Sequence, residues 1–98
     1  MTKQQFLDSL NETASPQGLS PYLAALWLEH SGDWAKAHET VQDISDTRAA
    51  LVHAYLHRKE GDQSNASYWY GKAAKTFPSL SLEEEWDELV ERFLSEGQ

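Results

Sequence analysis

Two Gly-Asp pairs constrain the fold of this chain more than any other feature of its sequence. Gly61-Asp62 follows Gly32-Asp33 after 29 residues, and an alanine stands five positions after each glycine. Glycine ends helices well because it adopts the left-handed conformation at low cost, and aspartate is a favourable N-cap for a following helix. The alanine provides a small contact where two helices approach closely. The pattern therefore predicts two tight reversals, each joining a pair of packed helices.

Apolar residues recur at helical spacing along the whole chain, and no segment alternates with a period of two. Pro78 is expected to end the fifth helix, and Ser81 with Glu84 predicts a capping box at the start of the last one. The four tryptophans are expected in the core. The expected helices cover about residues 3–13, 21–30, 34–43, 47–60, 63–77 and 82 onward. We predict an all-α fold of about six antiparallel helices, with two helical hairpins between an N-terminal and a C-terminal capping helix.

A chain of 98 residues is long enough for one domain. We expect residues 20–78 to form its repeat-like core, residues 1–19 an N-terminal cap and residues 79–98 an acidic C-terminal capping helix. Two repeats rarely bury a core unaided, because each unit needs neighbours to cover its apolar face. The two end helices are therefore expected to cover the open ends of the hairpins.

The composition excludes some classes of partner. The net charge is −8, and residues 80–98 hold seven acids and one base. Nucleic-acid binding needs a basic face, so it is not expected, and the acids of the last helix are expected on a solvated face. No apolar run approaches the length of a membrane span, and the N-terminal residues lack the pattern of a signal peptide. Without cysteine, we expect neither disulfides nor thiolate metal sites, and we expect a cytoplasmic location.

The second hairpin carries the spacing of a known repeat. Gly61, Ala66, Tyr70, Ala73 and Pro78 stand where the tetratricopeptide repeat has its second-half motif, and the chain resembles that family over residues 20–78. Residues 66–74 are also similar to Sel1-like repeats, and residues 32–39 and 52–62 to small bacterial proteins of unassigned activity. The resemblance implies a module for protein or peptide binding, or for assembly through self-association. Enzymatic activity stays open.

Two groups of residues are candidates for a functional site. Helix faces of such hairpins commonly line a groove, and aromatic residues with arginine are typical of peptide-binding hot spots. The candidates for the groove are Tyr55, Arg58, Asn65 and Tyr68.

The second group consists of histidines. His53 and His57 stand at i and i+4, where one helix face can present both imidazoles to a divalent metal such as zinc. His38 lies on the preceding helix, and Glu39 or Glu60 could complete a ligand set. No other cofactor is expected. Two alternatives stay open: hydrogen-bonded core histidines, or a metal-free acid–base pair of a histidine with a glutamate.

Overall fold

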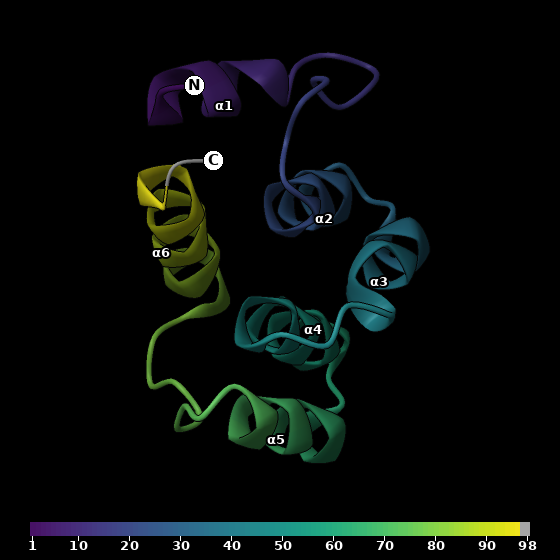
Figure 1. Ribbon diagram of the computed structural model, residues 1–98, viewed down its shortest axis with the longest axis vertical. Coiled ribbons are helices and arrows are strands. Elements are labelled where there is room, and N and C mark those ends of the chain that lie inside the picture. Colours follow the sequence, from purple (N-terminus) through teal and green to yellow (C-terminus); the bar gives the residue numbers. More distant parts are fainter. Residues whose placement is uncertain (97–98) are drawn as a thin grey trace.

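A computed structural model describes residues 1–96, which form six α-helices and no strand (Figure 1). The predicted all-α fold of about six helices is confirmed. Residues 97 and 98 of the predicted C-terminal cap lie outside the described residues. The helices are α1 (Lys3–Ser9), α2 (Pro21–His30), α3 (Trp34–Gln42), α4 (Thr47–Glu60), α5 (Gln63–Lys72) and α6 (Leu82–Ser95).

Every one of these helices starts with a side-chain cap. An oxygen of the residue before the helix accepts a hydrogen bond from the backbone N–H three positions further on, which satisfies a donor that the helix itself leaves free. The predicted capping box of Ser81 and Glu84 is present at the start of α6. The six N-caps are Thr2, Ser20, Asp33, Asp46, Asp62 and Ser81.

The two Gly-Asp pairs form equivalent reversals. Gly32 and Gly61 have φ angles of +96° and +92°. In both turns the glycine N–H donates to the carbonyl three residues earlier, and the aspartate N–H donates to the carbonyl five residues earlier, at 2.9–3.1 Å. This pairing satisfies the last carbonyls of one helix while the aspartate side chain caps the next. The alanines that follow, Ala37 and Ala66, are fully buried.

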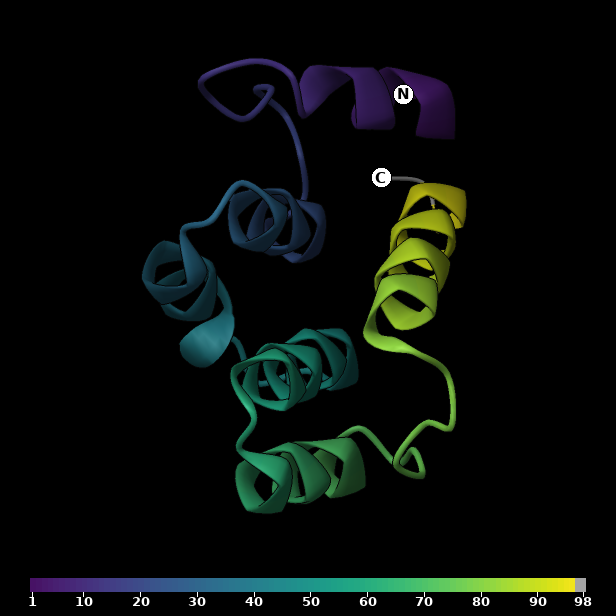
Figure 2. The ribbon, with the colours of Figure 1, turned by 180° about the vertical axis from the view of Figure 1, so that it is seen from behind.

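The reversals place α3 along α2 and α5 along α4, and α6 contacts α1, α2 and α4 (Figures 1 and 2). Both ends of the described chain therefore lie on the same side of the molecule, which measures 33 × 26 × 25 Å. Lys3 of α1 binds Asp87 of α6 at 2.8 Å. The indole N–H of Trp86 donates to the carbonyl oxygen of Leu26 at 3.1 Å, so α6 is held to α2 inside the bundle.

Two helix ends differ from the prediction. Helix α1 ends at Ser9, and α5 ends at Lys72 rather than at Pro78. Ala74 adopts a left-handed φ of 58°, and the N–H of Lys75 returns to the carbonyl of Tyr70 at 2.9 Å. An alanine therefore closes the helix by the geometry that glycine favours, so the end of α5 could not be recognised from residue type.

Glu85 is the clearest correction to the predicted acidic face. It was expected among solvated acids, but it is only 4% exposed. Its carboxylate binds Arg58 at 2.8 Å and accepts a hydrogen bond from the Tyr70 hydroxyl at 2.6 Å. Burial and this carboxylate together raise the pKa of Tyr70. One acid of α6 thus forms a buried polar link to α4 and α5.

Candidate metal site

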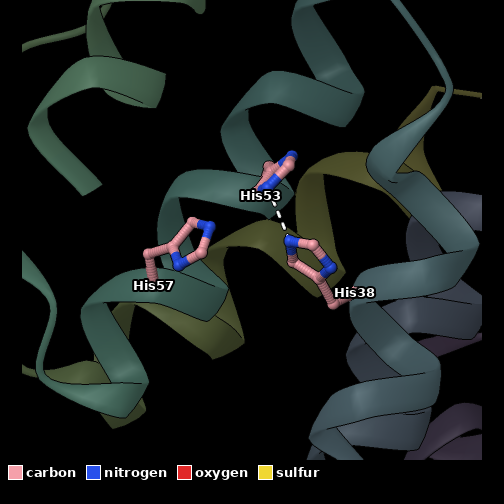
Figure 3. A group of neighbouring side chains, drawn as sticks. All are labelled: His38, His53 and His57. Atoms are coloured by element: carbon pink, nitrogen blue, oxygen red, sulfur yellow. Dashed lines mark hydrogen bonds between the residues drawn. The ribbon is translucent and has the colours of Figure 1, made fainter. Parts of the chain in front are cut away.

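Three histidines converge between α3 and α4. His53 and His57 stand one turn apart on α4, and His38 faces them from α3 (Figure 3). One ring nitrogen from each lies within 4.8 Å of one from each of the others. The ring centroids are 4.5 Å apart for His38 and His53, and 4.9 Å apart for His53 and His57. The packing of α3 on α4 therefore brings together the three histidines that the sequence singled out.

Two hydrogen bonds fix the orientations of these rings. The Nε2 atoms of His38 and His53 lie 2.8 Å apart, so one of them carries a hydrogen and the other presents a lone pair. His57 uses Nδ1 to bind Oε2 of Glu60 at 2.7 Å. Its other ring nitrogen points toward His38 and His53 (Figure 3). The cluster thus has an internal hydrogen bond and one bond to an outer carboxylate.

Tryptophans cover the cluster on two sides. Trp69 of α5 stacks on His53 with ring centroids 3.9 Å apart, and Trp34 stacks on His38 at 5.0 Å. His53 and His57 are 5% and 7% exposed, whereas His38 is half-buried. Trp34 and Trp69 are themselves half-buried rather than deep in the core as expected. His38 is therefore the histidine of the cluster that is most accessible to solvent.

Burial keeps two of the imidazoles neutral at physiological pH. Desolvation, with smaller effects of His38 and His57, lowers the pKa of His53 from 6.5 to about 4. Desolvation also lowers the pKa of His38, against the opposing charges of Glu60 and Glu39. A neutral imidazole has a free lone pair, which is the form that binds a metal.

To hold a metal ion, the ring nitrogens would have to move and one proton would have to change position. Ligand nitrogens at about 2.0–2.1 Å from a tetrahedral zinc ion lie about 3.4 Å apart. The His38–His53 contact of 2.8 Å must therefore open slightly, and the wider separations, up to 4.8 Å, must close. One of these two rings must also carry its proton on Nδ1, so that both Nε2 atoms are free.

A second group shares His57. One ligand atom each of His57, Glu60 and Asp62 lies within 4.8 Å of the others. Both carboxylates are exposed, and Asp62 already accepts hydrogen bonds from the backbone and the side chain of Asn65. This group therefore lies on the outer, Nδ1 side of His57. Glu39, the other carboxylate that the sequence offered as a ligand, is exposed and belongs to neither group.

The four groove candidates do not gather on one surface. Tyr55 is 1% exposed and donates its hydroxyl hydrogen bond to Glu29 at 3.1 Å. Arg58 is engaged with Glu85. The side chain of Asn65 donates a hydrogen bond to Asp62, the N-cap of α5. Tyr68 is 58% exposed on the same helix.

Tyr55 lines a cavity of about 570 Å³ to which the other three candidates do not contribute. The cavity lies among α2, α4 and the beginning of α6. Glu29 is buried in the bundle and lines the cavity, where its Oε2 lies 3.5 Å from Nζ of Lys59. The rings of His30 and Trp86 lie 4.8 Å apart at its side. The complete lining is Glu29, His30, Tyr55, Lys59, Glu83, Glu84, Trp86 and Asp87.

The chain matches no protein-family model, no curated protein and no solved structure. The resemblance to tetratricopeptide repeats stays a prediction, and the arrangement of the residues alone carries the functional argument. Among residues 1–96, no helix has the length and apolar character needed to cross a bilayer.

Sequence reasoning missed the two tryptophans that flank the histidines and the buried carboxylate of Glu29. Trp34 and Trp69 have the helical spacing of core residues, and nothing in the sequence indicates that they stack on imidazoles. Glu29 precedes the end of α2 and looks like an ordinary surface acid. Only the position of α4 beside α2 reveals its burial.

Proposed function

We propose that this protein binds a divalent transition-metal ion, with zinc as the reference case, through the imidazoles of His38, His53 and His57. The proposal is supported above all by the convergence of three ring nitrogens from two helices within 4.8 Å. Imidazole suits zinc, copper, nickel and iron, whereas magnesium and calcium prefer oxygen ligands. The proposed ion is therefore a borderline transition metal.

The surroundings of the three rings favour this role. Burial holds His53 and His38 neutral, so a metal ion does not compete with protons on charged imidazolium groups at neutral pH. The stacked Trp69 and Trp34 limit the motion of the same two rings. Because fewer side-chain rotamers are lost on binding, a restrained set of ligands binds more tightly than a mobile one.

Zinc titration of the chelator-treated protein tests the proposal. We expect one equivalent to bind, with a rise in melting temperature of about 10–20 °C at a free zinc concentration 100 times the dissociation constant. His53→Gln and His38→Gln should each abolish most of the rise. His38 is half-buried, so His38→Gln can test the site even if replacement of the buried His53 impairs folding.

The matched control is His30→Gln, which alters the one histidine outside the cluster. It should keep the zinc response. Identical melting curves with excess zinc and with chelator, or equal responses of His30→Gln and His38→Gln, would refute metal binding at this cluster.

We also propose a second candidate function, peptide binding, supported by the cavity beside Tyr55. Four carboxylates and one lysine line it, with Trp86 and His30 as aromatic neighbours. Carboxylates next to aromatic rings suit a lysine or arginine side chain, through charge and cation–π attraction. The partner would be a peptide with basic residues.

Fluorescence anisotropy with labelled peptides tests this second candidate. A lysine- and arginine-containing peptide should bind, a glutamate-containing peptide of equal length should not, and Asp87→Asn should weaken binding. Glu39→Gln is the control, because it removes one negative charge from a residue that does not line the cavity. Equal binding of the two peptides, or equal effects of the two variants, would exclude the cavity as the site.

A further inference from the structure

The carboxylate of Glu60 holds one histidine of the cluster from outside. Glu60 is the last residue of α4, three positions after His57, and its Oε2 lies 2.7 Å from Nδ1 of that ring. The imidazole is 8% exposed and the carboxylate side chain 38%. An acid in the last turn of a helix opposes the helix dipole. Helix stability therefore does not explain an acid at position 60, and its direct contact is with His57.

This contact selects a tautomer. A carboxylate accepts hydrogen bonds, so Nδ1 of His57 carries the hydrogen, and in the neutral ring Nε2 then presents its lone pair. Nδ1 faces outward to Glu60, and the opposite edge of the ring points to His38 and His53 (Figure 3). The free lone pair is therefore directed at the place where the ring nitrogens converge.

Within the part of the chain that the structure describes, no carboxylate sets the tautomers of the other two rings in this way. His38 and His53 face each other through Nε2, and one of these two atoms carries a hydrogen. That hydrogen must move to Nδ1 before both rings can bind the same ion through Nε2. Either His38 or His53 can be the ring that presents its lone pair, whereas a carboxylate sets the binding form of His57.

We propose that Glu60 is a positioning residue of the metal site: it orients His57 and fixes the tautomer that offers Nε2 to the ion. This inference rests on the proposed metal function and deepens it. A carboxylate behind a ligating imidazole also makes the ring a stronger base, and loss of such a partner weakens metal binding about 10–100-fold. We expect that loss for Glu60→Ala.

The matched control is Glu39→Ala. Glu39 is exposed, it neighbours His38 in sequence, and its replacement changes the net charge equally. A general electrostatic effect would weaken zinc binding in both variants alike. We expect less than a threefold change for Glu39→Ala, and an intermediate effect for Glu60→Gln, whose amide oxygen can still accept the hydrogen bond.

Asp62→Asn separates positioning from direct ligation. If the ion bound on the outer side of His57 with Glu60 and Asp62 as ligands, both Glu60→Ala and Asp62→Asn would lose affinity. The positioning role predicts that Asp62→Asn binds zinc as the wild type does. Equal losses in the two variants would overturn the proposal.

A second readout follows the tautomer itself. Long-range ¹H–¹⁵N NMR of the metal-free protein should show His57 with its hydrogen on Nδ1, and this signature should change in Glu60→Ala but not in Glu39→Ala. Zinc affinities come from competition with a chromophoric chelator. If the wild type binds zinc and Glu60→Ala binds it with the same affinity, this inference alone is overturned. If the wild type binds no zinc, both the inference and the proposed metal function are overturned.

Discussion

Mild acid will destabilise the metal-free protein through His53. The folded state holds the pKa of His53 at about 4, whereas an exposed histidine has a value of 6.5. Between these two values the unfolded chain binds a proton that the folded chain does not. The stabilising contribution is therefore complete above pH 6.5 and is lost progressively as the pH falls toward 4.

The magnitude follows from the two pKa values. Each pKa unit corresponds to about 1.4 kcal/mol, and the linkage relation gives a loss of about 2 kcal/mol between pH 7 and pH 5. His38 acts in the same direction, because burial lowers its pKa as well. Carboxylates with lowered pKa values, Asp46 and Glu84, act mainly below this range.

Urea denaturation at half-unit steps of pH, with a chelator present, measures this effect. His53→Gln should be less stable at pH 7, but its free energy of unfolding should fall by about 2 kcal/mol less than that of the wild type between pH 7 and pH 5. His30→Gln leaves the cluster intact and should keep the full loss. Parallel pH curves for wild type and His53→Gln would refute the argument that His53 is held neutral by burial.

Three further predictions concern the scaffold and can be measured by thermal or urea denaturation. Gly61→Ala should cost about 1–2 kcal/mol, because φ is +92° there although a Cβ would meet nothing within 4 Å; an unchanged stability would contradict the strain argument. Gly71→Ala should instead stabilise the protein by about 0.5 kcal/mol, since that residue is helical with open space around it, and a loss would contradict the described end of α5. Glu85→Ala should cost about 3–5 kcal/mol, because Arg58 and Tyr70 lose a buried partner; a cost under about 1 kcal/mol would show that the carboxylate is solvated.

The helical scaffold was largely predictable because local chemistry determines it. The Gly-Asp pairs marked both reversals, and α4 spans the predicted residues 47–60. The end of α5 was not predictable, because Ala74 takes a conformation for which its side chain gives no signal. The burial of Glu85 depends on contacts with Arg58 and Tyr70, which are distant in sequence.

The sequence identified the three histidines of the site but not how their rings are arranged. The spacing of His53 and His57 places both on one face of any helix, so their proximity follows from the sequence alone. The approach of His38 depends on the rotation of α3 against α4, which helical periodicity does not specify. The stacking of Trp34 and Trp69 on these rings depends on the same packing.

The position of α6 has a consequence for any partner of the hairpins. Residues 82–95 lie against both α2 and α4, and the indole of Trp86 is tied to the backbone of α2. The chain thereby supplies its own occupant for that side of the helix pairs. An incoming helix could use the same side only by displacing α6 and breaking the Arg58–Glu85 link. Partners that leave the fold intact are confined to the outer faces and to the openings between helices.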